Sequence, residues 1–153
     1  MAKSSPDGHD FLRPDEYGAW NGLLLLNRQV LSELDAALRD AHQLAVSEFD
    51  VLITLYNAPD RRLRMSTLAE RVMLSNAGLT HLVTRLERDG LVQREVDPGD
   101  GRKWFTVLTD AGAERLREAR ATHNDVLRRT ILAKTSPAER KLLAQLWERL
   151  RQD

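Results

Sequence analysis

Cysteine is missing from the 153 residues of this sequence, which excludes disulfides, thiolate nucleophiles, thiolate metal ligands and cysteine redox switches. Long apolar runs are missing too: the longest consists of four leucines at residues 23–26, far too short to span a bilayer. The first ten residues are polar and lack the apolar segment of a signal peptide. These absences predict a cytoplasmic protein with no membrane partner.

Motifs of the common enzyme classes are also missing. The sequence has no Gly-x-Ser-x-Gly elbow, no glycine-rich phosphate loop and no His-Glu-x-x-His pair. Its four histidines show no metal-ligand spacing, and His42 and His123 suit a helix end and a helix packing face better. We therefore expect a protein that is not an enzyme, with no catalytic residues, no bound metal and no cofactor.

The net charge of zero arises from two unlike parts of the chain. Residues 1–60 carry a net charge of −6, whereas residues 61–104 and 105–153 carry +3 each. The positive surplus thus lies in the middle and C-terminal parts, where it is available to an anionic partner such as nucleic acid. The acidic excess lies in the N-terminal part, which we expect to sit away from that partner.

Helical periodicity dominates the pattern along the chain. Residues 1–13 are turn-rich and predict a flexible tail, and residues 14–46 predict one long amphipathic helix. Ser47 suits the cap of a second helix, with Asp50 supported by the helix dipole, and Pro59 ends it. The arginines at 61, 62 and 64 fall in the loop that follows.

The middle of the chain predicts two short helices and one hairpin. Ser66 suits the cap of the first helix, and Ser75 the cap of the second, which ends at Gly90. Residues 91–96 and 103–108 predict two strands around a charged turn at 97–101. Thr109 then caps a helix that extends to about residue 134, and Ser136 opens the last helix with a capping box.

This order of elements predicts a mainly α protein with a small β-hairpin wing. We expect residues 47–109 to form a winged helix-turn-helix DNA-binding domain, and residues 14–46 and 110–153 to form a helical dimerisation region. The terminal helices carry long apolar stripes for which one such domain offers little packing surface, so we expect a homodimer.

The helix after Ser75 has one apolar and one polar arc. Its apolar arc faces the core, and the opposite arc carries hydrogen-bonding and small side chains without a carboxylate. Such a face suits a major groove, where Thr, His and Arg side chains bind base edges and phosphates. The candidate DNA-binding residues of this helix are Ser75, Asn76, Thr80, His81, Thr84, Arg85 and Arg88. Arg85 has an equally good alternative as an ion-pair partner of Glu87 or Asp89 on a solvated face.

The hairpin supplies a second set of candidates. Arg102 follows the turn, and an arginine at a narrow hairpin tip can enter a minor groove, where the potential is most negative. Asp100 can hold its guanidinium through a charge-assisted pair. Arg94 and Lys103 can contact phosphates on either side.

Several short motifs resemble the MarR-type bacterial transcriptional regulators. They include Leu-Ala-Glu at 68–70, Gly-Leu-Val-Gln-Arg at 90–94, Asp-Pro at 97–98, Asp-Gly-Arg at 100–102 and Leu-Thr-Asp-Ala-Gly at 108–112. The resemblance implies an obligate homodimer with interlocked terminal helices that binds a palindromic operator. It also implies Asp100 and Arg102 as the wing-tip pair. His81 and Gly101 depart from the family pattern, which has arginine at both positions.

The resemblance further implies release of DNA by a small, often aromatic ligand that binds between the dimerisation and DNA-binding regions. Trp20, His42 and Asp50 are the candidate ligand-binding residues, although packing and helix-dipole roles explain them as well. The alternative to a ligand-responsive repressor is a winged-helix scaffold for protein interaction or dimerisation that has no specific operator.

Overall fold

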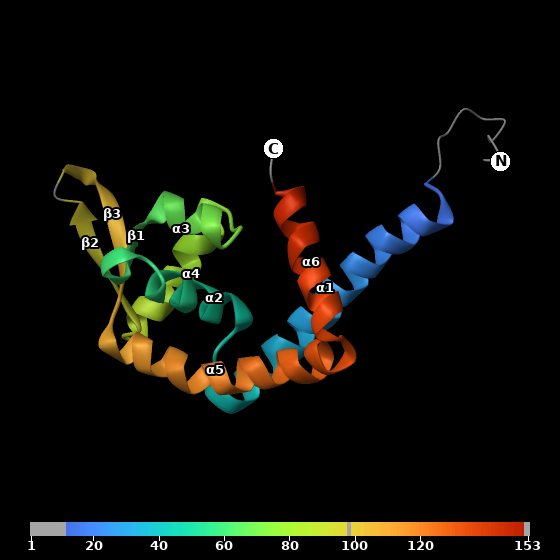
Figure 1. Ribbon diagram of the computed structural model, residues 1–153. Coiled ribbons are helices and arrows are strands. Elements are labelled where there is room, and N and C mark those ends of the chain that lie inside the picture. The colour runs from blue at the N-terminus through green and yellow to red at the C-terminus, as the bar shows by residue number, and fades with distance from the viewer. Residues whose placement is uncertain (1–11, 98, 152–153) are drawn as a thin grey trace.

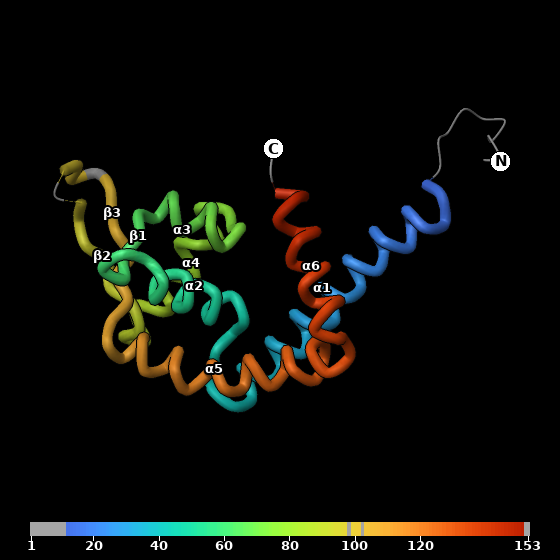
Figure 2. Tube along the Cα trace, in the orientation of Figure 1, coloured from blue at the N-terminus to red at the C-terminus, as the bar shows by residue number. Residues whose placement is uncertain are grey.

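The computed structural model describes residues 12–97 and 99–151, and of Arg102 it describes the backbone only. The expected N-terminal tail therefore lies, up to residue 11, outside the described residues. Two groups of elements stand apart, with α5 extending beneath both (Figure 1). One group holds α2, α3, α4 and the small sheet, and the other holds α6 and the N-terminal half of α1. The trace in Figure 2 shows the same separation.

Helix α1 (Pro14–His42) is the long amphipathic helix that the sequence predicts. Proline occupies its first turn, and Glu16 accepts a hydrogen bond from the Arg13 backbone N–H at 2.7 Å. Gln43 ends the helix in a left-handed conformation with φ of 52°. The C-terminal half of α1 packs on α5 through a small buried cluster of Val30, Leu34 and Val126.

Helix α2 (Val46–Tyr56) begins one residue before the expected cap, so the prediction of Ser47 as its cap is wrong. Ala45 is the cap position, and the Glu48 carboxylate accepts a hydrogen bond from its N–H at 2.7 Å. A carboxylate three residues into a helix satisfies this donor better than a serine that already lies within the first turn. A short 3₁₀ turn, η1 (Pro59–Arg61), follows α2.

Helices α3 (Met65–Arg71) and α4 (Asn76–Arg88) form the helix-turn-helix pair. Arg64, rather than the predicted Ser66, is the cap position of α3, because strand β1 leads directly into the helix. Ser75 caps α4 as predicted, and its hydroxyl accepts a hydrogen bond from the Gly78 N–H at 3.1 Å. Gly90, with φ of +72°, follows the end of α4 in the left-handed conformation that its position requires.

The sheet has three strands, whereas the sequence predicts a two-stranded hairpin. Strands β2 (Val92–Asp97) and β3 (Asp100–Leu108) form the wing, and β1 (Arg62–Arg64) pairs antiparallel with β3 to give the order β1-β3-β2. The prediction of a loop at the three arginines is therefore wrong for Arg62 and Arg64. The three-residue pattern Arg-Leu-Arg is too short to predict a strand from the sequence. The segment becomes a strand because it pairs with β3.

Helix α5 (Asp110–Thr130) begins at the Thr109 cap and ends before the predicted residue 134, because a 3₁₀ turn, η2 (Leu132–Lys134), follows it. Helix α6 (Pro137–Leu150) has the predicted capping box of Ser136 and Glu139. The main core joins α2, α3, α4, the sheet and the first half of α5. No residue of α6 is buried. No helix in the described part of the chain is long and apolar enough to cross a membrane.

Candidate nucleic-acid interface

Helix α4 presents an exposed polar face on the surface of the compact group of elements. Its apolar face is buried against the core, with Leu79, Leu82, Val83 and Leu86 at most 8% exposed. The opposite face is exposed; its side chains are Asn76, Thr80, His81, Thr84 and Arg88. The one carboxylate of α4, that of Glu87, lies beside them and is paired with Arg94. The amphipathic pattern thus places five of the predicted DNA-binding residues on one accessible surface.

Two threonine hydroxyls on this face bind the helix backbone. Thr80 donates to the Asn76 carbonyl and Thr84 donates to the Thr80 carbonyl, both at 2.8 Å. Each hydroxyl oxygen keeps the capacity to accept a hydrogen bond. At Thr84 a guanidinium N–H of Arg94 already donates to that oxygen at 2.7 Å.

Arg94 on β2 connects the wing to α4. Besides Thr84, it donates to the Thr80 carbonyl at 3.4 Å and pairs with Glu87 at 3.4 Å. The backbone N–H of Arg94 also donates to the Glu87 carboxylate at 3.2 Å. Arg94 therefore braces the wing against α4 in the free protein, and its predicted contact with a phosphate remains a prediction.

Arg85 pairs with neither residue that the alternative interpretation names. Its guanidinium donates twice to one oxygen of Glu48 on α2, at 3.1 Å from Nε and 2.5 Å from Nη2. The Glu48 side chain is only 9% exposed, and its second oxygen caps α2. The prediction of Glu87 or Asp89 as its partner is thus wrong, because α2 packs closer to this side chain. Arg88 pairs with Asp89 at 3.0 Å instead.

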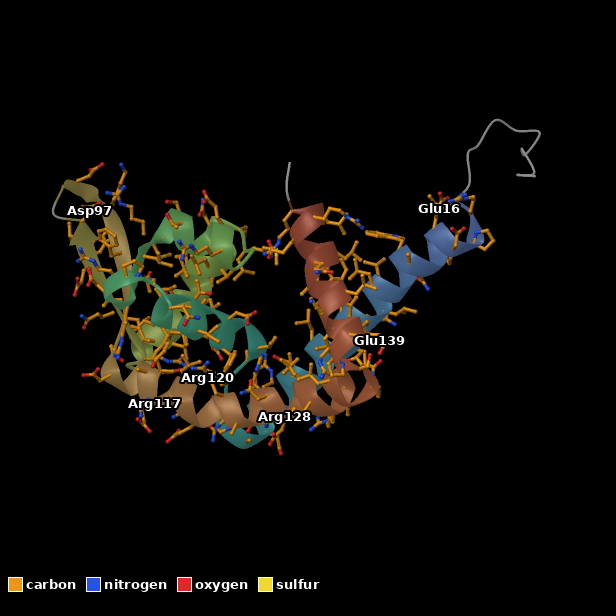
Figure 3. The ribbon with its side chains drawn as sticks, viewed as in Figure 1. Glu16, Asp97, Arg117, Arg120, Arg128 and Glu139 are labelled. Atoms are coloured by element: carbon orange, nitrogen blue, oxygen red, sulfur yellow. The ribbon has the colours of Figure 1, made fainter. Side chains whose placement is uncertain are left out.

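At the wing tip, Lys103 pairs with Asp100 at 3.1 Å. The predicted pair of Asp100 with Arg102, and the groove contact of that arginine, lie outside the described side chains. Near the tip, Asp97 of β2, which is labelled in Figure 3, is buried. Its carboxylate pairs with Arg64 of β1 at 2.6 Å. A hydrogen bond from the Gly99 N–H, assisted by the Arg64 guanidinium, holds the pKa of Asp97 below its usual value.

Residues 44–104, which span this interface, match the model of the MarR family. The chain is 32% identical to the HTH-type transcriptional regulator YkoM of Bacillus subtilis over 107 residues, which are 69% of this chain and 68% of YkoM. It is 33% identical to the HTH-type transcriptional repressor YetL of the same organism, over 70% of this chain and 66% of YetL.

A solved structure agrees with these sequence matches. Sco3205, a MarR family transcriptional regulator from Streptomyces coelicolor in complex with DNA, is 30% identical with a TM-score of 0.86. The match covers 93% of this chain and 89% of Sco3205. This chain belongs to the MarR family. It is a winged helix-turn-helix, DNA-binding transcriptional regulator, as its motifs predict.

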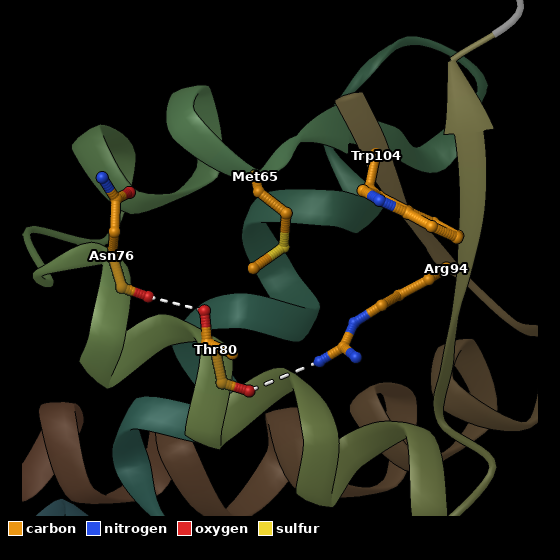
Figure 4. Close-up of a pocket in the computed structure, with 5 residues that line it drawn as sticks. All are labelled: Met65, Asn76, Thr80, Arg94 and Trp104. Atoms are coloured by element: carbon orange, nitrogen blue, oxygen red, sulfur yellow. Dashed lines mark hydrogen bonds between the residues drawn. The ribbon is translucent and has the colours of Figure 1, made fainter. Parts of the chain in front are cut away.

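A cavity of about 360 Å³ lies between α4 and the wing of this MarR regulator, beside the bridging Arg94 (Figure 4). Its lining combines apolar Met65 and Trp104 with polar Asn76, Thr80 and Arg94. The sequence analysis did not identify this cavity, because its lining comes from α3, α4 and both strands of the wing. A tryptophan two residues after Arg102 on the strand opposite Arg94 is the signal that could have pointed to it.

The predicted ligand-binding residues do not form one site within a single chain. Trp20 and His42 lie 22 residues apart on the continuous helix α1, which corresponds to about 33 Å. The His42 Nε2 atom lies 2.8 Å from the Thr122 hydroxyl of α5. Asp50 is exposed, yet surrounding protein atoms displace water and raise its pKa, an effect that His123 partly offsets. None of the three lines the cavity between α4 and the wing.

Proposed function

We propose that this MarR regulator is a homodimeric repressor that binds a palindromic operator and is released from it by a small aromatic ligand. The exposed polar face of α4, whose one neighbouring carboxylate, Glu87, is paired with Arg94, carries this proposal. In it, Asn76, Thr80, His81 and Thr84 bind base edges in the major groove, and Arg88 binds the phosphate backbone. Arg102 enters the adjacent minor groove, with Lys103 near a phosphate.

A second copy of this chain is the partner that we assign to the terminal helices. Large apolar side chains on α1 and α6 remain exposed: Tyr17, Trp20, Leu24, Leu142, Trp147 and Leu150. Soluble monomers rarely expose so many apolar side chains on two long helices, and a symmetric contact buries both sets at once. The domain division follows from this, with residues 14–46 and 110–153 serving dimerisation and residues 47–109 binding DNA.

The cavity beside α4 supports regulation by a ligand. Trp104 and Met65 offer an apolar surface for a flat ring, and Arg94 offers a cation for a carboxylate. Asn76 and Thr80 belong both to the cavity wall and to the proposed base-reading face. A ligand in this cavity would therefore compete with DNA for the same side chains. The repressor role is further supported by YetL, which is a transcriptional repressor.

Binding and footprinting titrations with the intergenic DNA beside its own gene test whether the protein binds a specific palindromic operator. We expect protection of two half-sites about 10 bp apart, because two α4 helices of a dimer meet successive major grooves. Arg102→Ala should weaken binding by about 1–3 kcal/mol. Absence of binding at low salt would overturn the repressor and favour the winged-helix scaffold. Protection of one half-site would overturn the dimer.

A thermal-shift titration with small aromatic acids such as benzoate tests the ligand. A ligand that binds only the folded protein must raise its melting temperature. Arg94→Met should abolish that shift, whereas Lys103→Met, a cation outside the cavity, should keep it. A shift that survives Arg94→Met would place the ligand elsewhere.

A further inference from the structure

One face of the sheet carries two arginines, two carboxylates and an aromatic ring. Arg64, Phe105 and Glu95 face one another across the three strands in register. The Arg62 and Arg64 guanidinium groups lie over the Phe105 ring, at 4.7 and 5.6 Å from its centroid. Asp97 lies on the same side of the sheet, because its carboxylate pairs with Arg64.

The two carboxylates on this face have unlike environments. Glu95 lies 3.9 Å from Arg62, and both side chains are about 40% exposed. Asp97 lies 2.6 Å from Arg64, and its side chain is 6% exposed. Water and salt screen the first pair strongly and the second pair much less.

Asp97 also holds the turn at the tip of the wing. One of its oxygens accepts a hydrogen bond from the Gly99 N–H at 2.9 Å, while the other faces Arg64. Arg64 is in turn the residue from which α3 begins. The carboxylate thus connects the backbone of the wing tip to the start of the helix-turn-helix pair.

This connection lies where the backbone ladder of the wing becomes irregular. The register of β2 and β3 shifts between Val96 and Asp97, and Asp97 pairs directly with Asp100 across the tip. Such an irregularity leaves the direction of the remaining turn less well determined by backbone hydrogen bonds. A buried side-chain pair at the same point can supply the missing constraint.

We propose that Arg64 and Asp97 are positioning residues that hold the wing tip in place for its contact with DNA. The proposal rests on the wing contact of the proposed function. Neither residue needs to touch DNA. Arg64 fixes the Asp97 carboxylate, and Asp97 fixes the turn from which β3 and Arg102 follow.

Asp97→Asn tests the proposal, with Glu95→Gln as the matched control. Each variant removes one negative charge from β2 on the same face of the sheet. If charge alone matters, both variants bind operator DNA more tightly, since repulsion from phosphates falls. Positioning predicts the opposite sign for Asp97→Asn, about threefold to tenfold weaker binding, while Glu95→Gln binds as well as the unmodified protein or better. Equal or tighter binding by Asp97→Asn would overturn the proposal.

A double-mutant cycle distinguishes an indirect role of Arg64, through the wing tip, from a direct contact between Arg64 and DNA. Arg64→Met should weaken operator binding in the unmodified protein and have little further effect in an Arg102→Ala background. An equal loss in both backgrounds would show that Arg64 acts independently of the tip. If Arg102→Ala alone leaves affinity unchanged, the proposed wing contact fails and the positioning role fails with it.

Hydrogen exchange of the free protein provides a readout that needs no DNA. The Gly99 amide should exchange faster in Asp97→Ala, which removes the acceptor, than in Asp97→Asn, which keeps one. Amides of α5 should exchange at unchanged rates in both variants. A general rise across the protein would indicate lost stability rather than a loosened wing tip, and would overturn the specific role.

Discussion

Glu48 joins the first turn of α2 to helix α4 through Arg85. One carboxylate oxygen caps α2 at Ala45, and the other accepts two hydrogen bonds from a guanidinium 37 residues further along the chain. The carboxylate is almost fully buried, while Arg85 remains half exposed. A single side chain therefore fixes where one helix begins and how the DNA-facing helix sits against it.

Glu48→Ala should lower the free energy of unfolding by about 2–3 kcal/mol, because it removes a helix cap, leaves the buried Ala45 N–H without its acceptor and breaks the pair with Arg85. Chemical denaturation at one fixed protein concentration measures this loss. Glu114→Ala is the control, since that carboxylate forms an exposed pair with Arg117 and its loss should stay within about 0.5 kcal/mol. Equal losses for the two variants would contradict a special role for Glu48.

Gly112→Ala should destabilise the protein by more than about 3 kcal/mol or prevent its folding. A Cβ atom at this position in the first turn of α5 would lie 2.0 Å from the Leu91 carbonyl oxygen and 2.7 Å from a Leu108 methyl. Gly18→Ala is the matched control, because an added Cβ atom at residue 18 would have no neighbouring atom within 4 Å. Alanine also favours a helix over glycine by about 1 kcal/mol. Thermal denaturation of both variants separates a steric effect from a general intolerance of alanine.

Met73→Gly should stabilise the protein by about 0.5–1 kcal/mol. Met73 lies in the turn between α3 and α4 with φ of 52°, a left-handed conformation that a side chain disfavours, and it is 91% exposed. Its removal thus relieves strain and loses almost no packing. Val72→Gly should have the opposite effect, because its φ is −90° and its side chain packs on the core. A lower melting temperature for Met73→Gly would show that the exposed side chain stabilises the turn.

Asp50→Asn should stabilise the protein near neutral pH and leave it unchanged in acid. Although the Asp50 side chain is exposed, nearby protein atoms displace part of its water and raise its pKa, so the folded state binds a proton more readily than the unfolded state. Its ionised form therefore opposes folding above the raised pKa, and this penalty fades as pH falls through the raised pKa and is absent well below the ordinary value of 3.8. Melting curves from pH 3 to 7 should show a gain in melting temperature for the variant at the neutral end only.

Glu139→Gln should show the opposite pH dependence. The N–H and hydroxyl of Ser136 lower the pKa of Glu139, so its ionised form stabilises the fold at neutral pH. That contribution is present above the ordinary value of 4.5 and is lost as pH falls through the lowered pKa. The melting temperatures of the variant and the unmodified protein should therefore differ at pH 7 and converge in strong acid. A difference independent of pH would contradict the role of the charge.

The sequence predicts the helices and the exposed face of α4 because local physics determines them. Ser75, Thr109 and Ser136 cap their helices as predicted, since each side chain bonds an N–H three residues away. The apolar spacing of α4 determines which face is exposed. These features depend on neighbours within one or two turns of the chain.

The features that the sequence does not predict depend on distant residues. Strand β1 forms because Leu63 and its neighbours pair with β3, more than 40 positions later. Arg85 finds Glu48 rather than a nearby carboxylate because tertiary packing brings α2 beside α4. The Arg64–Asp97 pair and the cavity beside α4 arise in the same way, so periodicity and local motifs give no sign of them.

Thr109 joins the start of helix α5 to the residues that follow helix α4. Its hydroxyl donates to the Gly90 carbonyl at 2.8 Å and its N–H donates to the Leu91 carbonyl at 3.2 Å, so the end of α4 and the end of the wing are fastened to one point. The 21 residues of α5 form a lever about 31 Å long, and a tilt of about 5° moves its far end by about 3 Å. In the proposed dimer, a small change in the packing of the two subunits would thus alter the distance between the two DNA-binding domains without changing the structure within either domain.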